Sequence, residues 1–364
     1  MAIKLRRAAT IRIARGPVVL DGPILTSTSI FTGESSEFLA RLDKRTYKEV
    51  WRKQKMAWVR RAHRDSILVY AGREKETQLW NEDGQILWKL RGMLSLGNDR
   101  LFLNDGGRLQ TIDILTGDLV DEFECPPGKP GMMHDGVLLL RNLEGATDPV
   151  QAVDLARRTV VWKRHLVSDI KDRYGDTCPH GLAFVASYPG QFVAKSVERL
   201  VGVSLTDGRM LWGLEISVPY LAPLVEDGRM YVWSAPSAST STRVTFDLDS
   251  GQITRERSEP AASENRLVIV DEAMGKIVVD RPLVPYGAAF RQVQEAYGGT
   301  ICRNHFVFTS KSGLMAAFRL SDGELVWQHQ HSDQLFSPVF EDNRLYVACA
   351  DGTLVVFEAE GGEL

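Results

Sequence analysis

The sequence lacks the features that mark exported or membrane-spanning proteins. Only four of its 364 residues are cysteines, and they stand singly along the chain, at Cys125, Cys178, Cys302 and Cys349. Such scattered cysteines are typical of reduced, buried thiols in a cytoplasmic protein. No apolar run approaches the roughly 20 residues of a membrane-spanning helix. The basic N-terminus never continues into the apolar stretch of a signal peptide. We therefore expect a cytoplasmic protein that does not bind membranes.

A strong excess of charge is also lacking. The chain has 44 basic and 47 acidic residues, a net charge of −3, which makes nucleic acid an unlikely partner of the chain as a whole. With 44% apolar and 25% charged residues, the composition excludes disorder and favours a large buried core. No P-loop, dinucleotide-binding glycine motif or zinc-protease motif occurs. The sequence therefore offers no standard catalytic signature.

What the sequence does contain is a repeat. Each copy has an alternating strand, an acidic or polar residue, a turn usually ending in glycine, and a tryptophan position four residues after that glycine. Two clear copies are VSLTDGRMLW near residue 204 and FRLSDGELVW near residue 319, and others lie at 40–51, 79–88, 111–121, 152–162 and 245–255. Period-two alternation predicts strands with one buried face, and the glycine supplies the positive φ of a tight hairpin.

The spacing of the copies predicts the architecture. Most copies are 33 to 50 residues apart, close to the roughly 40–45 residues of a four-stranded propeller blade. The last unit, 336–360, supplies three strands, and the opening segment 9–16 can add the fourth and cover the open edge. We predict an all-β, eight-bladed β-propeller of four-stranded antiparallel blades, closed by its N- and C-terminal strands, in one domain over 1–364. A count of seven blades stays open.

One stretch fits this scheme poorly. Residues 259–292 contain the hairpin RLVIVDEAMGKIVVDRPLV, whose Gly275 stands in the repeat frame, but the stretch has too little room for a full blade. We interpret it as an insertion hairpin in a neighbouring blade, with a degenerate blade as the alternative.

Five of the eight tryptophans occupy the tryptophan position of the repeat: Trp51, Trp88, Trp162, Trp212 and Trp327. Large flat rings at one register of the fourth strand can pack between neighbouring blades, burying about 150–250 Å² each. We therefore assign these residues a structural role in docking blade against blade.

The repeat frame A-x-D-x-x-T-G-x-x-x-W resembles that of the pyrroloquinoline-quinone-like (PQQ-like) β-propeller repeat proteins, and the resemblance extends over nearly the whole chain. One branch of that family comprises quinone-dependent dehydrogenases with a calcium ion. The other comprises non-catalytic scaffolds, such as the lipoprotein subunit of the outer-membrane barrel-assembly machinery. The enzymes are generally exported and much longer, and many carry a vicinal cysteine pair that this chain lacks. The resemblance therefore favours the scaffold branch, without a cofactor.

Histidine chemistry is the main route to an enzymatic interpretation. His329 and His331 lie two residues apart at a predicted strand end, and His165 and His180 lie in the connection after Trp162. A metal site needs three or four such ligands with supporting contacts, and no local spacing provides them. We predict no catalytic, cofactor-binding or metal-binding residues. A propeller lyase or hydrolase, or a PQQ-dependent dehydrogenase, remains the alternative.

The distribution of charge along the chain is uneven. Residues 1–64 carry 15 Lys/Arg and 5 Asp/Glu, a net charge of +10, whereas the remaining residues carry 29 and 42, a net charge of −13. These basic residues either decorate solvated strand faces or form a docking surface for an acidic protein segment. Residues 52–55 and the connection after Trp162 are expected in loops of the ligand-binding face, and residues 60–64 after a first strand. The predicted docking residues are Arg52, Lys53, Lys55, Arg60, Arg61, Arg64, Arg164, His165, Lys171 and Arg173.

The sequence thus favours a non-enzymatic, protein-binding scaffold propeller in the cytoplasm. Short loops on a rigid ring suit recognition, because little ordering is needed on binding.

Overall fold

The structure, a computed structural model, shows an all-β chain. It describes residues 3–14, 22–34, 37–54, 57–71, 73–92, 94–97, 99–141, 150–164, 183–188, 191–195, 200–214, 216, 224–234, 242–246, 253–257, 265–271, 274–283, 286 and 296–360. These residues form strands and turns, and the predicted fold class is confirmed. No helix in this described part of the chain is long and apolar enough to cross a membrane.

The chain divides into two compact units. Unit 1 comprises Met1–Met93 and Arg281–Leu364, and unit 2 comprises Leu94–Asp280. The described residues form eight antiparallel sheets in all, which is consistent with the eight blades predicted. That all 364 residues act as one domain stays a prediction.

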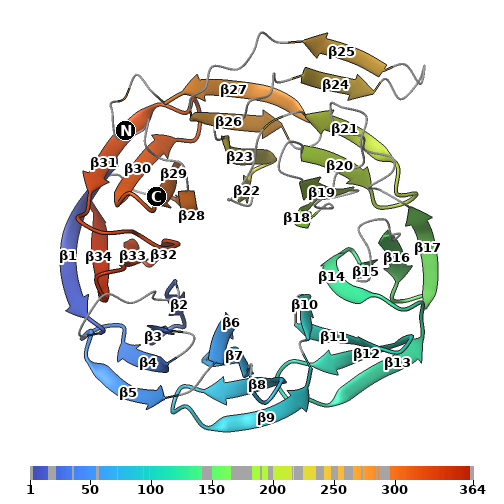
Figure 1. The fold of residues 1–364 in the computed structure, drawn as a ribbon, viewed down its shortest axis with the longest axis horizontal. Coiled ribbons are helices and arrows are strands. Elements are labelled where there is room, and N and C mark those ends of the chain that lie inside the picture. Colours follow the sequence, from blue (N-terminus) through green and yellow to red (C-terminus); the bar gives the residue numbers. More distant parts are fainter. Residues whose placement is uncertain are drawn as a thin grey trace. The chain divides into compact units, whose positions relative to one another are not determined.

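Unit 1 is built around four sheets of four strands (Figure 1). Their strands, from first to fourth in each sheet, are β2 (Ile24–Leu25), β3 (Ser29–Glu34), β4 (Phe38–Asp43) and β5 (Glu49–Gln54); β6 (Ala57–His63), β7 (Ser66–Ala71), β8 (Glu76–Asn81) and β9 (Ile86–Arg91); β28 (Ala296–Cys302), β29 (His305–Ser310), β30 (Leu314–Arg319) and β31 (Leu325–Gln330); β32 (Val339–Glu341), β33 (Arg344–Ala348), β34 (Thr353–Glu360) and β1 (Lys4–Arg12). The first strands β28, β32, β2 and β6 contact one another in that order and form the inner edge of the unit.

Unit 2 also contains four sheets, one of them enlarged. Their strands are β10 (Ser95–Gly97), β11 (Arg100–Asp105), β12 (Arg108–Asp113) and β13 (Leu119–Glu124); β14 (Lys129–His134), β15 (Val137–Arg141), β16 (Val150–Asp154) and β17 (Thr159–Arg164); β18 (Ala183–Tyr188), β19 (Gln191–Lys195), β20 (Leu200–Ser204), β21 (Met210–Leu214), β24 (Thr242–Phe246) and β25 (Ile253–Arg257); β22 (Leu224–Glu226), β23 (Arg229–Ser234), β26 (Arg266–Asp271) and β27 (Lys276–Pro282). The boundary between the units falls within β27.

The two chain ends meet in one sheet of unit 1, as predicted. Strand β1 pairs antiparallel with β34, from Lys4 opposite Glu360 to Arg12 opposite Thr353. Because β1 comes from the N-terminus and β32–β34 from the C-terminus, this sheet forms only when both ends are in place. The N-terminal strand also covers what would otherwise be the open edge of β34.

The structure reverses the predicted roles of two hairpins. The hairpin at 266–282 is no insertion: β26 pairs along its whole length with β23, from Arg266 opposite Ser234 to Asp271 opposite Arg229. It therefore supplies the third and fourth strands of the sheet begun by β22. The repeat copy at 245–255 is instead the added hairpin, because β24 pairs with the edge of β21 through Val244 and Arg243.

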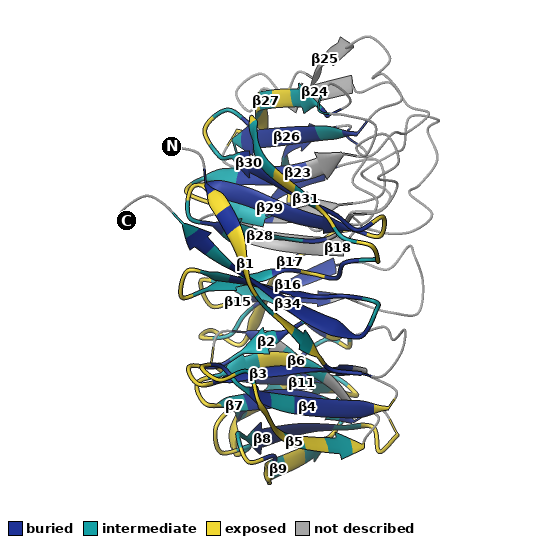
Figure 2. Cartoon of the chain, turned by 90° about the vertical axis from the view of Figure 1, so that its left-hand side faces the viewer, coloured by how far each residue is buried: buried dark blue, intermediate teal, exposed yellow. Residues whose placement is uncertain are grey.

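The hydrophobic core lies between adjacent sheets. In unit 1, Phe31 and Leu39 of one sheet pack with Ile67, Val69 and Trp80 of the next. The third strands β4 and β8 are mostly buried, whereas the fourth strands β5 and β9 alternate between exposed and half-buried residues (Figure 2). The fourth strand therefore offers its side chains to the neighbouring sheet and to solvent.

Candidate functional site: the basic strands β5 and β6

The tryptophans of the fourth strands bind the turn of the next sheet. The indole Nε1 of Trp51 donates to the backbone oxygen of Glu82 at 2.7 Å in unit 1. In unit 2, Nε1 of Trp162 donates to the backbone oxygen of Leu205 at 2.8 Å. Both acceptors lie in the turn between the third and fourth strands. These rings therefore join neighbouring sheets by packing and by a hydrogen bond.

The turn glycine makes room for the ring. Gly84, Gly208 and Gly275 have φ values of 73°, 70° and 60°, a region that side chains disfavour. A Cβ atom on Gly208 would lie 2.6 Å from the ring of Trp162, and one on Gly275 would lie 2.3 Å from that of Trp212. Glycine is thus required at these turns for both its conformation and its close contact with indole.

The two remaining tryptophans of the repeat lie on β9 and β31. Trp88 is half-buried on β9. Trp327 stacks on His329 with ring centroids 6.0 Å apart and meets Phe357 edge-on at 5.8 Å. Because Phe357 belongs to β34 of the next sheet, Trp327 also lies between sheets.

A basic residue two positions after the tryptophan position makes a second contact between sheets. On β5 the ammonium group of Lys53 donates to the backbone oxygen of Gly84 and lies over the ring of Trp80, 5.3 Å from its centroid. On β17, Arg164 Nε donates to the backbone oxygen of Asp207 at 3.1 Å. Both acceptor residues belong to the same turn that receives the tryptophan.

On β27 the same position is basic although the tryptophan is missing. Val279 stands in the tryptophan position of β27, and Arg281 follows it by two residues. Its Nη2 donates to the backbone oxygen of Asp322 at 3.0 Å, within unit 1. The contact of a basic side chain with a turn carbonyl thus recurs independently of the indole.

The loop positions predicted for Arg52, Lys53 and Arg164 are wrong. All three lie in fourth strands and not in connections. Arg52 pairs with Glu49 at 2.6 Å, donates to the backbone oxygen of Ile13 at 2.7 Å and stacks over the ring of Phe38. These side chains are held by contacts inside the protein, and such contacts compete with partner binding.

The turn that receives Trp51 is itself anchored by Glu82. Its carboxylate accepts hydrogen bonds from Thr26, Thr28 and Ser29 and pairs with Arg41 at 3.0 Å. Burial alone would raise the pKa of the Glu82 carboxyl, but these hydroxyl groups and the charge of Arg41 hold it below its usual value. Glu82 thus remains ionised and fixes the turn against the neighbouring sheet.

Strand β6 presents its basic residues differently. Arg60 and Arg61 lie within this first strand, at the inner edge of unit 1, and not after it as predicted. A β-bulge between Val59 and Arg61 leaves Arg60 without an opposite residue on β7, and both arginines are exposed. Bulges redirect side chains in this way. The exposed Arg64 follows in the turn to β7, with φ 51°.

Several other basic residues of the N-terminal region are paired within unit 1. Arg6 pairs with Glu360 at 2.5 Å, and Lys4 with the same carboxylate at 3.8 Å. The buried Lys44 pairs with Asp342 at 2.8 Å. These three charges are therefore matched by acidic residues near the C-terminus.

Four predicted docking residues, Lys55, His165, Lys171 and Arg173, lie outside the described residues. His180 also lies outside them. Among the described members of the predicted set, Arg52, Lys53 and Arg164 lie on fourth strands, whereas Arg60, Arg61 and Arg64 lie on β6 and in the turn after it.

The histidines predicted to share a face have different surroundings. His329 lies against Trp327 and Phe357 and contacts Arg7 at 3.2 Å. Burial, and then the charges of Arg7 and His331, lower the pKa of His329. His331 lies instead near two carboxylates, and in the described part of the chain this is the group whose atoms gather closely enough to hold a metal ion.

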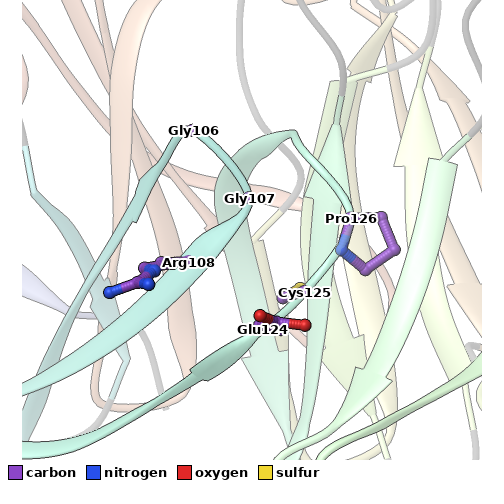
Figure 3. A pocket seen from close by; sticks show the side chains of 6 residues that line it. All are labelled: Gly106, Gly107, Arg108, Glu124, Cys125 and Pro126. Carbon is purple, nitrogen blue, oxygen red and sulfur yellow. The ribbon is translucent and has the colours of Figure 1, made fainter.

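A shallow cavity of about 450 Å³ lies in unit 2, between the β11–β12 turn and the end of β13 (Figure 3). It is lined by Gly106, Gly107, Arg108, Glu124, Cys125 and Pro126. Burial raises the pKa of the Cys125 thiol to about 11, so this sulfur is protonated and a poor nucleophile at neutral pH.

Comparison with known proteins places the chain among β-propellers of one family. The family described as outer membrane protein assembly factor BamB matches residues 146–281 and 263–364, more than half of the chain. No protein with a curated description matches.

Similar solved structures extend over the whole chain. The computationally designed protein Ika8 is 14% identical, with a TM-score of 0.65 over 97% of this chain and 99% of that one. BamB from Moraxella catarrhalis is 13% identical, with a TM-score of 0.59 over 98% and 100%. The quinohemoprotein alcohol dehydrogenase from Comamonas testosteroni is 13% identical, with a TM-score of 0.60 over 99% and 77%. At such low identity these likenesses show the β-propeller fold alone.

Proposed function

We propose, from the premise that this chain belongs to the PQQ-like β-propeller repeat family, that it is a non-enzymatic scaffold that binds another protein. The matching family carries the description of an outer membrane protein assembly factor, and a role in assembly supports the binding of other proteins. The fold alone does not decide the matter, because an alcohol dehydrogenase shares it. The proposal therefore depends on the residues that the structure leaves available to a partner.

The observation that carries the proposal is the contrast between β5 and β6. Arg52 and Lys53 are engaged with neighbouring carbonyl groups, whereas Arg61 and Arg64 are exposed on β6 and in the turn after it. Exposed arginines attract carboxylates over several ångströms and form two-pronged hydrogen bonds on contact.

We therefore propose that an acidic segment of a partner protein docks along β6. Two other inner strands of unit 1, β2 and β32, carry apolar residues apart from Glu341, which pairs with Lys44. These two strands offer no basic side chain to an acidic segment, which favours β6 as the docking location. For Lys55, His165, Lys171 and Arg173 a docking role stays a prediction. The three described cysteines, Cys125, Cys302 and Cys349, are buried free thiols, which supports a reducing compartment, and we place the protein in the cytoplasm.

The proposal is tested by charge reversal with a matched control. The variant R60E/R61E/R64E is compared with R45E/K48E/R73E, which changes three other exposed basic residues by the same charge. Binding of a fluorescein-labelled peptide rich in Asp and Glu is measured by fluorescence anisotropy at low and physiological salt.

We expect the β6 variant to weaken peptide binding by about tenfold or more and the control to leave it nearly unchanged. Equal loss in both variants would show nonspecific attraction and contradict a site at β6. Unchanged binding in the β6 variant would also contradict it.

A further inference from the structure

Three potential metal ligands of unit 1 meet outside the basic strands. His331 and Asp333 lie in the connection from β31 to β32, and Asp351 lies in the turn from β33 to β34. One ring nitrogen of His331 and one carboxylate oxygen of each aspartate all lie within 4.8 Å of one another. They are far in sequence from Arg60 and Arg61, so this group is a second, independent candidate site.

The backbone holds the three residues in register. Leu335 forms a β-bridge with Cys349, and the N–H of Ala350 donates to the oxygen of Gln334 at 2.9 Å. Asp333 precedes Leu335 by two residues and Asp351 follows Cys349 by two, so this bridge brings the two aspartates near each other. The N–H of Asp333 donates to Nδ1 of His331 at 3.2 Å. The bridge and this hydrogen bond therefore bring the three side chains together.

Hydrogen bonds orient both carboxylates and leave one oxygen of each available. The N–H and hydroxyl of Thr353 donate to Oδ1 of Asp351 at 2.9 and 2.5 Å. The hydroxyl of Ser332 donates to Oδ2 of Asp333 at 3.3 Å. Such outer contacts fix the direction of metal ligands.

The ring of His331 offers a lone pair at Nδ1, which accepts the N–H of Asp333 at 3.2 Å. Because this contact is long, a metal ion that takes the Nδ1 lone pair gives up only a weak hydrogen bond. The ring can then bind in its neutral form, with the proton on Nε2.

The electrostatics give an independent reason to expect a cation. The carboxylates of Asp333 and Asp351 have oxygen atoms within 4.8 Å of each other, and like charges this close repel. In the described part of the chain, neither Asp333 nor Asp351 forms an ion pair with a Lys or Arg side chain. Arg12 lies nearby but donates to the backbone oxygen of Asp351, at 2.7 Å, and not to its carboxylate. A bound divalent cation would offset the repulsion between the two carboxylates.

We propose that His331, Asp333 and Asp351 bind a divalent transition-metal ion such as Zn²⁺ or Mn²⁺, with water completing the coordination. One imidazole and two carboxylates suit these ions, whereas Ca²⁺ prefers a set of six to eight oxygen ligands. The ion joins the connection after β31 to the β33–β34 turn of the next sheet. This role is structural and does not depend on the proposed docking of a partner at β6.

The proposal is tested by titrating tag-free, chelator-treated full-length protein with Zn²⁺ and with Mn²⁺ by isothermal titration calorimetry. The variants are D333N, D351N and H331Q. The matched control is H134Q/D135N, which alters another histidine–aspartate pair, 3.3 Å apart in unit 2. Circular dichroism checks that each variant folds. Should D351N fail to fold because Asp351 also holds Thr353, the exposed Asp333 and His331 decide the test.

We expect one equivalent of Zn²⁺ or Mn²⁺ to bind and each ligand variant to weaken binding by at least about tenfold, with the control unchanged. An excess of Ca²⁺ should not compete. Equal affinity in wild type and D333N, or equal loss in the control, would mean an adventitious ion only and would overturn the proposal. Because the readout contains no peptide, this result is independent of the experiment on β6.

Discussion

Strands β5 and β6 are neighbours in the sequence and belong to the same unit, yet their basic residues have opposite surroundings. On β5, a fourth strand, Arg52 and Lys53 reach backbone carbonyl groups of other strands and turns. On β6, a first strand at the inner edge of unit 1, Arg60 and Arg61 are exposed at a bulge. A run of positive charge in a sequence is therefore no measure of the positive surface that the folded chain presents.

The difference arises from the position of each strand in its sheet. A fourth strand lies beside the turn of the next sheet, whose carbonyl groups need donors, and a basic side chain two residues after the tryptophan position can supply them. On the first strand β6, Arg61 is exposed instead. Lys53 and Arg164 follow this rule in unit 1 and unit 2, respectively.

The strongest test of the role of β5 is W51A. Loss of the ring removes the packing against Phe31 and the hydrogen bond to Glu82, so we expect the free energy of unfolding to fall by about 3 kcal/mol. Urea denaturation measures the change. The control is V50A at the exposed neighbouring position, where we expect at most about 0.5 kcal/mol. A similar loss in both variants would contradict the docking role of the indole.

The second test concerns the glycine that receives this ring. We expect G84A to lower the free energy of unfolding by about 1–3 kcal/mol, because alanine is strained at φ 73° and its Cβ would lie 2.8 Å from Lys53. Gly106 has φ 59° but nothing within 4 Å of a Cβ, so G106A measures the conformational cost alone. If both variants lose equal stability, the close contact contributes nothing.

The third test compares the two strands directly. We expect K53M to lower the free energy of unfolding by about 1 kcal/mol, because the turn carbonyl of Gly84 loses its charged donor. We expect R61M on β6 to change it by no more than about 0.5 kcal/mol. The comparison fails if the exposed residue matters as much as the residue engaged in contacts.

The smallest effect is expected from pH at His329, which occupies the position of Lys53 in β31. Its lowered pKa means that the folded protein resists protonation of this ring more than the unfolded chain does. The stability contribution is complete above the ordinary pKa of 6.5 and declines as the pH falls below it. Thermal denaturation from pH 8 to pH 5 should show a weaker pH dependence in H329Q than in wild type. An unchanged slope would exclude this origin.

The repeat could be predicted from the sequence because it is local. Alternating apolar residues, turn glycines and the tryptophan register specify strands and hairpins within about ten residues of each other. For the same reason, the closing pair of β1 and β34 followed from an unpartnered strand at each chain end. The structure confirms the fold class on this basis.

The roles of two hairpins could not be predicted in the same way. TFDLDSGQITR matches the repeat frame closely, yet its strand β24 joins the outside of another sheet. RLVIVD matches it less well, but Val268 and Val270 are buried in the core with Trp212. Which hairpin completes a four-stranded sheet depends on burial against distant residues. The alternation of apolar and polar residues does not decide it, because that alternation is alike in the two hairpins. The apolar run at 267–270 was the signal that favoured a central strand.

In the candidate site, too, some features could be predicted from the sequence and others were decided by the tertiary structure. The sequence alone identified the basic region, the tryptophan register and the absence of catalytic motifs. Which arginines face solvent was decided by the tertiary structure, because the acceptors for Arg52, Lys53 and Arg164 come from other segments of the chain. Likewise, Asp351 lies near His331 and Asp333 only because Leu335 forms a bridge with Cys349. A sequence specifies which groups can bind, and the fold, by bringing distant partners together, determines which of them remain free to do so.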